Sequence, residues 1–482
     1  MRTLVDIEVE EIPILAQREF AQGARLAHLV GRDCGDSIEL TYVFLGAFDH
    51  RREYRVRVSP HGATVDSLAE LSFSAGRLER LVRDQLGVQF RGHPEARPLM
   101  RHGHWPNDVL PLRAGPLTVD VRDDAEPYPF LTVPGPGVYE IPVGPVHAGL
   151  IEPGHFRFSV VGETIIQMSA RLWFVHRGLE RLAIGRSIEE VVRLAEVVSG
   201  DSAVSHSLAY LRAVEDAMGV EVPPEVVARR QGLLELERVT HHVADLGALA
   251  NDAGYSVAFS RAMTLVETLQ RLGERVTGHR LLRGALVVGG AHWNDAPASR
   301  TFSELAEEIS HLAEWIGRHP TVRDRFDSTG VLRKEDASRL GVLGPVARAS
   351  GVSEDARHDH PWGLSMPLRL QSSGDVRARF EQRVVEALDS LEVLHRVSEG
   401  ECPNGLETDS DSTGEGLGVV EGWRGAVVHR VTLEGTRVVR WAPLDPSFFN
   451  WPAVAVSLAD TIVPDFPLVN KSFNLSYAGN DL

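Results

Sequence analysis

LLELERVTHHVADLGALANDAGY, residues 233–255, carries the clearest helical pattern in the chain. Its apolar side chains recur every three or four positions, at Leu236, Val239, Val243 and Leu246. This spacing places them on one face of an α-helix. Pro224 lies upstream and suits a first helical turn, where no backbone N–H is required from it. The pattern therefore predicts one long helix that begins at Pro224 and buries an apolar face.

Helical patterns surround this stretch from about residue 172 onward. The sequence SIEE at 187–190 has the composition of a capping box, and a second capping box is predicted from Thr301 to Glu304. Further helices are predicted at 203–218, 257–276, 301–317 and 374–397. Together these segments predict a buried helical bundle.

Strand-like patterns occur on both sides of the helical part. Alternating apolar residues predict hairpins at 38–58 and around Gly162, and a helix is predicted at 76–87. The Pro/Gly-rich stretch 127–145 is predicted not to pair regularly. The last 60 residues are predicted to be mainly strand-like, with strand-like and apolar content continuing past Asn450. The fold class is therefore α+β, with predicted domains at 1–115 and 141–482 joined by a linker at 116–140.

Composition narrows the range of functions. The 482 residues include 67 acidic and 50 basic side chains, a net charge of -17 that argues against a nucleic-acid partner. The two cysteines, Cys34 and Cys402, are too few to bind an iron–sulfur cluster without a partner. No long apolar run or signal peptide is evident, so any membrane association is expected to come through partner subunits.

The loop VVSGDSAVSH at 197–206, called the serine loop below, has the spacing of a metal-binding loop. Ser199, Ser202 and His206 occupy positions where thiolates and an imidazole would share one transition metal. One interpretation is a polar pocket or a hard-metal site at Asp201, Ser202 and His206. The alternative is a loop that ends one helix and caps the next, with His206 packed on a helix face. Serine, aspartate and glycine are common in loops for backbone reasons, which favours the alternative.

Six separated stretches then match a known family in the right order. They are GPVHAGLIEPGHFRF at 144–158, the serine loop, 233–255, LGVLGPVARASGVSEDAR at 340–357, EGWRG at 421–425 and LDPSFFNW at 444–451. Together they resemble the large subunit of energy-converting [NiFe] hydrogenases of the formate hydrogenlyase type. They also resemble the homologous quinone-site subunit of complex I, the 49 kDa type. Residues 78–113 are similar to the 30 kDa-type accessory subunit, which implies that the two are fused here.

The resemblance implies that the nickel ligands have been lost. The four cysteine positions of the hydrogenases fall at Ser199, Ser202, Ser447 and Asn450. His206 falls at the histidine of the first motif, and Asp445 is in register with the second. Nickel requires soft, charged ligands, so we expect no metal centre in this chain.

The quinone site of complex I is also altered. The resemblance places its histidine at Ile151 and its tyrosine at Gly200, so a quinone is not expected to bind in the same pose. It places Glu152 where hydrogenases have a proton-passing glutamate, and Arg424 over the same cavity. With His206, these two are candidates for a proton relay; the alternative is that Glu152 and Arg424 form a buried ion pair that only shapes the cavity. The remaining cavity-lining candidates are His147, Ile151, Gly200, Asp201 and Asp445.

The family resemblance implies a place in a larger assembly. It implies a subunit on the cytoplasmic side of a membrane, bound to a small subunit with a [4Fe-4S] cluster and to antiporter-like membrane subunits. The chain itself is expected to bind no cofactor. Its reaction would be electron transfer from that cluster to an acceptor in the remodelled cavity, coupled to proton or ion movement. The alternative is a structural subunit without catalysis, and ligand chemistry disfavours an active hydrogenase.

Three further features are assigned no catalytic or binding role, and the first of them, a histidine pair, is interpreted as structural or interfacial. His241 and His242 are adjacent on a predicted helix and point about 100° apart, so they do not suit one metal ion. Gly289 and Gly290 lack the spacing of a phosphate-binding loop. The acidic run at 407–416 is interpreted as a solvated loop.

Overall fold

The structure, a computed structural model, describes most of the chain. The described residues are 2–106, 108–115, 117, 127–149, 151–294, 297–401 and 414–482. Cys402 and most of the acidic run at 407–416 lie outside them, as do most of residues 116–126 of the predicted linker. The fold combines several small sheets with a helical bundle, so the α+β prediction is confirmed.

The N-terminal region is built on a four-stranded sheet of order β1-β4-β3-β2. The hairpin predicted at 38–58 is β3 and β4, and the helix predicted at 76–87 is α2. Gly31 on β2 lets α2 come close, because a Cβ there would lie 2.2 Å from Leu86 Cδ1. The elements are β1 (Arg2–Asp6), η1 (Val9–Glu11), α1 (Ile12–Ala21), β2 (Arg25–Asp33), β3 (Ile38–Gly46), β4 (His50–Val58), β5 (Thr64–Asp66), α2 (Phe73–Leu86) and β6 (Gln89–Arg91).

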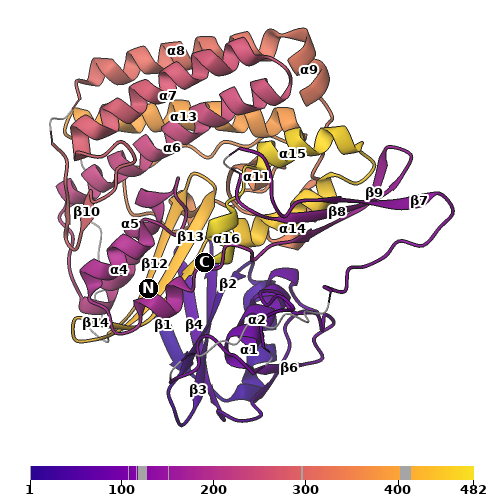
Figure 1. The fold of residues 1–482 in the computed structure, drawn as a ribbon. Helices are drawn as coiled ribbons and strands as arrows, with labels where there is room; N and C mark the ends of the chain where they lie inside the picture. Colours follow the sequence, from indigo (N-terminus) through magenta and orange to yellow (C-terminus); the bar gives the residue numbers. More distant parts are fainter. Residues whose placement is uncertain are drawn as a thin grey trace.

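Four long helices lie side by side and form the bundle at the top of Figure 1. They are α6 (Pro224–Asp252), α7 (Ser256–Thr277), α8 (Ser299–Arg318) and α13 (Val376–Ser398). Helix α6 begins at Pro224 as predicted, and its four periodic apolar side chains are at most 2% exposed. The predicted capping box at Thr301 is wrong: α8 begins two residues earlier, after Ala298, so Thr301 lies inside the helix.

Shorter helices and a small two-stranded sheet complete the helical part. The shorter helices are α3 (Leu179–Ala183), α4 (Ile188–Ala195), α5 (Ala203–Met218), α9 (Pro320–Phe326), α10 (Lys334–Leu340), α11 (Gly344–Ala349) and α12 (Ala356–Asp359). The strands are β10 (Leu286–Val287) and β11 (Gly290–Ala291). The capping box of α4 is confirmed: Ser187 N–H donates to Glu190 Oε2 at 2.9 Å, and Glu190 N–H donates to Ser187 Oγ at 3.3 Å.

A three-stranded sheet overlaps the stretch predicted to be irregular. Strands β7 (Val138–Val143), β8 (His155–Val161) and β9 (Thr164–Arg171) pair in that order, and β8 and β9 form the hairpin predicted around Gly162. The prediction that 127–145 does not pair is wrong for 138–143, and β7 begins within the predicted linker. Pro142 is tolerated because β7 is the edge strand, where one missing N–H donor leaves the β8 pairing intact.

The C-terminal part begins as a sheet of β12 (Glu415–Gly422), β13 (Gly425–Glu434) and β14 (Arg437–Leu444). Helix α5 lies directly on β12, because Gly416 and Gly418 have no side chains; a Cβ at either would be within 1.9 Å of a carbonyl oxygen of α5. The strand-like content predicted past Asn450 is wrong. Apolar residues there form helices, namely α14 (Ser447–Ser457), η2 (Val463–Asp465), α15 (Phe466–Phe473) and α16 (Tyr477–Asp481).

Buried ion pairs join the N-terminal region to the C-terminal sheet, which lies next to it in Figure 1. Arg430 on β13 donates to Glu53 on β4 at 2.8 Å, and both side chains are at most 2% exposed. Arg440 on β14 donates to the Gly31 carbonyl at 2.8 Å and to Glu180 at 2.6 Å. Buried ion pairs and hydrogen bonds therefore join the N-terminal region to the rest of the described fold, in addition to the chain that links them. In the described part of the chain, no helix has the length and apolarity to cross a membrane.

Candidate functional site

Three segments that are distant in sequence meet at the serine loop. The loop links α4 to α5, and the turn Trp423–Arg424 between β12 and β13 lies against it. The third segment is 474–482, called the C-terminal segment below, which contains α16. Hydrogen bonds among these three segments build the site.

An ion pair between Asp201 and Arg424 forms the centre of the site. Arg424 Nη1 and Nη2 donate to Asp201 Oδ1 and Oδ2, each at 2.6 Å, a two-pronged geometry that orients both groups. Arg424 Nε donates to the Asn474 carbonyl at 2.6 Å. Burial opposes ionisation of Asp201, but the Arg424 guanidinium outweighs it and lowers the pKa of Asp201. Asp201 is therefore a carboxylate at neutral pH.

Trp423 closes one side of this ion pair. The guanidinium carbon of Arg424 lies 3.8 Å from the Trp423 ring centroid, a cation–π distance. Trp423 Nε1 donates to the Asp201 carbonyl at 2.8 Å and to Ser202 Oγ at 3.0 Å. The same tryptophan thus holds both the backbone of the serine loop and the guanidinium that pairs with it.

Ser199 and Ser202, the loop positions that match hydrogenase cysteines, are held by other protein groups. Ser199 Oγ donates to Asp201 Oδ1 at 2.8 Å, so the proton of its 2.7 Å hydrogen bond with Ser476 Oγ comes from Ser476. Ser202 Oγ accepts from Arg424 Nη1 at 3.2 Å as well as from Trp423. Both serines are at most 3% exposed.

The other two positions that match hydrogenase cysteines, Ser447 and Asn450, are also hydrogen-bonded to protein groups. Ser447 Oγ accepts from Ser476 N–H at 2.9 Å. Asn450 pairs with the backbone of Leu343, accepting from its N–H at 2.8 Å and donating to its carbonyl at 3.1 Å. Both side chains are 0% exposed. Neutral hydroxyl and amide groups that are already hydrogen-bonded to other protein groups do not fit nickel, which takes soft anionic ligands.

His206 belongs to a buried hydrogen-bonded chain. Its Nε2 lies 3.0 Å from Asp445 Oδ2, and its Nδ1 lies 3.0 Å from His429 Nε2. Trp441 Nε1 donates to His429 Nδ1 at 3.1 Å. Because an indole N–H can only donate, His429 donates from Nε2 to His206, and His206 donates from Nε2 to Asp445. Burial lowers the pKa of His429, which keeps that ring neutral.

Asp445 connects the hydrogen-bonded chain of His206, His429 and Trp441 to the C-terminal segment. Its Oδ1 accepts from Ser447 N–H at 2.7 Å. A Cβ at Gly479 would lie 2.7 Å from the Asp445 carboxyl carbon, so only glycine allows α16 to come this close. Burial opposes ionisation of Asp445, but the hydrogen bond from His206 and the nearby Arg424 lower its pKa.

The predicted residues of the 144–158 stretch lie at the edge of the site. Glu152 is exposed, and its Oε2 accepts from Ala478 N–H at 2.9 Å. His147 donates from Nε2 to the Gly154 carbonyl at 2.7 Å, and Ile151 is 51% exposed. The alternative of a buried Glu152–Arg424 ion pair is wrong, because Arg424 pairs with Asp201 and Glu152 binds the backbone of α16.

Glu237 is a site residue that the sequence analysis did not select. Its Oε2 accepts from Val204 N–H at 2.6 Å, and its Oε1 accepts from Ser205 N–H at 3.0 Å and from Ser205 Oγ. The first free N–H donors of α5 are therefore satisfied by a distant carboxylate. The expectation that the serine loop caps this helix is wrong, since Ser202 at the N-cap makes no side-chain cap. The one sequence signal was that Glu237 lies four residues before His241.

The C-terminal segment was also missed, because strand-like content was expected there. It supplies Asn474, Ser476 and Ala478 to the contacts above and ends with Leu482 at 2% exposure. Among the described residues, no group of three or more His, Cys, Asp or Glu side chains is arranged to hold a metal ion.

Two parts of the chain match known families. Residues 252–411 match the family described as respiratory-chain NADH dehydrogenase, 49 Kd subunit, and residues 6–118 match the 30 Kd subunit. The chain is 32% identical to formate hydrogenlyase subunit 5 of Escherichia coli over 84% of this chain and 74% of that protein. It is 31% identical to the carbon monoxide-induced hydrogenase of Rhodospirillum rubrum, over 70% of this chain and 97% of that protein.

A complex I protein and a solved structure extend the comparison. The chain is 27% identical to the C/D subunit of NADH-quinone oxidoreductase from Phocaeicola vulgatus, with 66% of each covered. A chain of an archaeal membrane-bound sulfane sulfur reductase shares the fold, with a TM-score of 0.64 and 23% identity over 72% of this chain and 99% of that chain. The resemblances seen in the sequence are thereby confirmed. The chain belongs to the family of large subunits that membrane-bound hydrogenases share with complex I, with 30 kDa-type and 49 kDa-type regions joined in one polypeptide.

Proposed function

We propose that this protein is the peripheral large subunit of a membrane-bound oxidoreductase complex that works without a nickel–iron centre. Its relatives include a formate hydrogenlyase subunit and the alpha subunit of a membrane-bound hydrogenase from Pyrococcus furiosus. Membership of this family supports a complex of the same general type. Binding is expected on the cytoplasmic side of the membrane, through antiporter-like membrane subunits.

One observation supports a function without nickel chemistry. The four side chains at the hydrogenase cysteine positions are hydroxyls and one amide, each bonded to other protein groups. A nickel ion would have to break those bonds and would gain only weak neutral ligands in return. Hydrogen cleavage at a nickel site is therefore not part of the proposed function.

Electrons would have to come from a partner subunit. The described part of the chain contains one cysteine, the exposed Cys34, and a cubane cluster takes four cysteine thiolates. We therefore propose a small partner subunit with a [4Fe-4S] cluster as the electron source. The acceptor would bind close to the Asp201–Arg424 pair, where a carboxylate and a guanidinium are available to orient a polar group. With Ile151 and Gly200 at the complex I ligand positions, a quinone bound in the complex I pose is not proposed.

A structural, non-catalytic role is the second candidate, and one observation favours it. The C-terminal segment fills the space beside the serine loop, and its Ser476 bonds to both Ser199 and Ser447. A cavity that is occupied by the chain's own residues leaves little room for an electron acceptor. In this version the protein would hold the cluster-bearing and membrane subunits together.

Purification of the tagged complex in mild detergent tests the proposal. We expect elemental analysis to find no stoichiometric nickel, and iron–sulfur absorbance to elute with the chain. Stoichiometric nickel would overturn the nickel-free function. A colourless protein released without detergent would overturn membership of such a complex.

The electron-transfer role and the structural role predict different rates of cluster reoxidation. The partner's cluster can be reduced chemically, and its reoxidation followed in intact complexes that carry Asp201→Asn. Slower reoxidation, with the same proteins present in the complex, is expected if the acceptor binds at this site. An unchanged rate would support the structural role. Arg271→Lys, on the exposed face of α7, is the matched control for preparation effects.

A further inference from the structure

The hydrogen-bonded chain of Trp441, His429, His206 and Asp445 joins α5 to the C-terminal sheet. His206 on α5 lies between His429 on β13 and Asp445, which directly follows β14. Trp441 on β14 forms the other end of the chain. All four side chains are at most 1% exposed. The hydrogen bonds between them are therefore shielded from bulk water.

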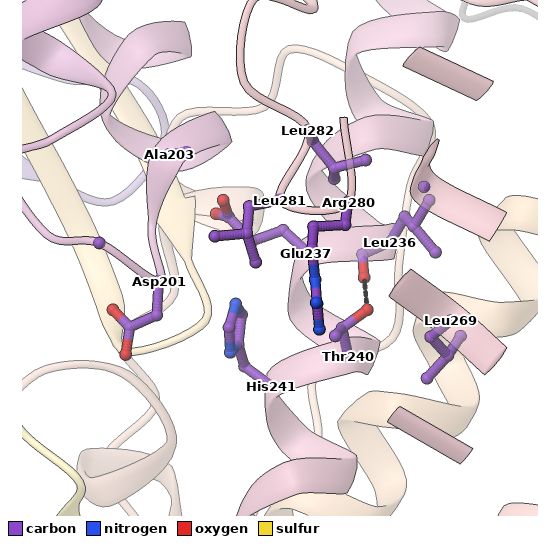
Figure 2. Close-up of a pocket in the computed structure, with 12 residues that line it drawn as sticks. Asp201, Ala203, Leu236, Glu237, Thr240, His241, Leu269, Arg280, Leu281 and Leu282 are labelled. Atoms are coloured by element: carbon purple, nitrogen blue, oxygen red, sulfur yellow. Dashed lines mark hydrogen bonds between the residues drawn. The ribbon is translucent and has the colours of Figure 1, made fainter. Parts of the chain in front are cut away.

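No member of this hydrogen-bonded chain lines the pocket beside the serine loop. That pocket opens next to Asp201 (Figure 2), and its interior has room for about one water molecule. Figure 2 shows Glu237 and His241 among the side chains that line it, and His206 is not one of them. The proton positions along the hydrogen-bonded chain are therefore set by protein groups.

The indole of Trp441 fixes the order of those protons. An indole nitrogen can only donate, so Trp441 Nε1 donates to His429 Nδ1 at 3.1 Å. Burial lowers the pKa of His429, and the neutral ring then carries its proton on Nε2. That proton is donated to His206 Nδ1 at 3.0 Å. His206 in turn carries its own proton on Nε2, 3.0 Å from Asp445 Oδ2.

The sheet and α5 hold Trp441 in the position that this order requires. His429 pairs with Pro443, and Trp441 lies two positions before Pro443, so His429 and Trp441 share one face of the sheet. Their ring centroids are 5.6 Å apart. Tyr210 of α5 packs edge-on against the indole, with centroids 5.9 Å apart. Backbone pairing and packing thus fix the donor at this end.

A second proton on His206 would disturb the order. It would sit on Nδ1 and face the Nε2–H of His429, which places two donors 3.0 Å apart. His429 relieves this conflict only by moving its own proton to Nδ1, where it faces the N–H of Trp441 at 3.1 Å. In either case a buried hydrogen bond is lost and a buried donor has no acceptor, which is costly.

We propose that Trp441 and His429 are positioning residues that keep His206 neutral, with its proton on Nε2. His206 then donates to Asp445 but has no free lone pair with which to accept a proton. At the other end, Trp441 can neither accept a proton nor release its own at neutral pH. The hydrogen-bonded chain is therefore a dead end for protons, and a relay in this region has to bypass His206.

This inference goes beyond the proposed function, because it concerns protons that stay in place and requires no electron acceptor or partner subunit. It removes His206 from the three candidates for a proton relay and leaves Glu152 and Arg424. Its test uses the full-length protein without an acceptor. The inference can therefore fail while the proposed function stands, and the reverse also holds.

Nitrogen NMR of the full-length wild-type protein, labelled with ¹⁵N in its histidine rings, tests the proton order. In the described part of the polypeptide, His206 and His429 are the two rings joined by an N–H···N hydrogen bond. A coupling across that bond therefore identifies the pair without a variant. Near neutral pH, two of the pair's four ring nitrogens are expected to be protonated. Three protonated nitrogens, or no coupling, would overturn the proposal.

Trp441→Phe tests whether the indole sets the order. Phenylalanine keeps an aromatic ring against Tyr210 but has no N–H, so His429 is free to carry its proton on Nδ1. His206 is then free to bind a second proton beside the Asp445 carboxylate. The groups that act on this proton are Asp445 and His429, with Arg424 acting on Asp445 and His28 on His429.

The third ring nitrogen of the pair is expected to become protonated in Trp441→Phe at a pH about one unit or more above that of wild type. Trp451→Phe is the matched control, because it also removes a buried indole N–H, which donates to the Ser476 carbonyl at 3.3 Å. It should behave as wild type. Equal behaviour of Trp441→Phe and wild type, or an equal shift in Trp451→Phe, would overturn the role of Trp441. If Trp441→Phe does not fold, the wild-type spectrum still decides the proton order.

Discussion

The Asp201–Arg424 pair shows how one side chain can hold three segments together. Arg424 uses two nitrogens for the serine loop and the third for the Asn474 carbonyl, while its plane lies over Trp423. A lysine carries the same charge but not this planar fork. The site therefore depends on the planar guanidinium of Arg424 and not on a positive charge alone.

Arg424→Lys is expected to loosen the serine loop and the C-terminal segment. Losing the fork and the bond to Asn474 should cost roughly 1.5–3 kcal/mol locally. Amide hydrogen exchange in residues 197–206 and 474–482 should then be about 10- to 100-fold faster. Arg271→Lys breaks only an exposed pair with Glu267 on α7 and should leave these rates unchanged. Unchanged protection in Arg424→Lys would show that packing alone holds the segments.

Glu79 gives a residue-scale pH dependence. Burial raises its folded-state pKa to about 7 from the ordinary value of 4.5, although Ser67 and the Leu68 N–H hydrogen-bond to it. Because the pKa of Glu79 is higher in the folded state than in the unfolded state, its protonated carboxyl contributes stability that is fully present below about pH 4.5. That contribution is lost as the pH rises to about 7. The full effect corresponds to about 3 kcal/mol.

We expect Glu79→Gln to remove this component. The variant should gain stability relative to wild type as the pH is raised from about 4.5 to about 7, by up to about 3 kcal/mol. Thermal melting across this range measures the difference. Glu10→Gln, at an exposed position, should follow the wild-type profile. A constant difference between Glu79→Gln and wild type at every pH would rule out this role for Glu79.

At the scale of elements, the sequence was most informative where a pattern is local. The apolar period of 233–255, the Ser187 capping box and the hairpin of β3 and β4 depend on neighbouring residues, and all three are present. The segment after Asn450 was misjudged because its apolar, β-branched residues suit a strand, and burial against the rest of the fold selects helices instead.

The candidate site was less predictable for the same reason. The serine loop and Arg424 could be found from motifs, but their partners are set by tertiary contacts. Ser476 lies 277 positions from its partner Ser199. Glu237 lies 33 positions from Val204, whose N–H donates to it. No local spacing encodes such pairs. Sequence reasoning therefore found the loop but not the groups that satisfy it.

The three C-terminal helices lead to a prediction about processing. Residues 451–482 are expected to remain in the mature protein, because they contribute side chains to the core. Helices α14 to α16 place Val454, Leu468 and Phe473 in the core, each at most 1% exposed. Intact-mass measurement of the protein from its native source should therefore include these residues. A mass that corresponds to an end near residue 453 would contradict the prediction.

At the scale of the whole molecule, buried charges join the N-terminal region to the C-terminal sheet. Glu53 and Arg430 come from the two different regions and are both shielded from water. Removing one member of such a buried pair leaves the other charge with less compensation for its burial. The relative position of the two regions is thus specified by a contact that neither region can make alone.

A double-mutant cycle measures this coupling. Arg430→Met alone is expected to destabilise the protein by about 3–5 kcal/mol, because the buried Glu53 carboxylate loses its ion pair with Arg430. The double variant Glu53→Gln with Arg430→Met should recover a large part of that loss. The exposed pair Arg261–Glu308 serves as a control and should show a coupling of no more than about 1 kcal/mol. Strict additivity at Glu53 and Arg430 would contradict the prediction.

The hydrogen bond between Ser199 and Ser476 also bears on folding kinetics. It closes a loop of 277 positions, and contacts of such long range cost the most chain entropy and form slowly. The serine loop should therefore stay open in partly folded chains and lock only at the last stage of folding. Substitutions at this contact should then accelerate unfolding while leaving the folding rate nearly unchanged.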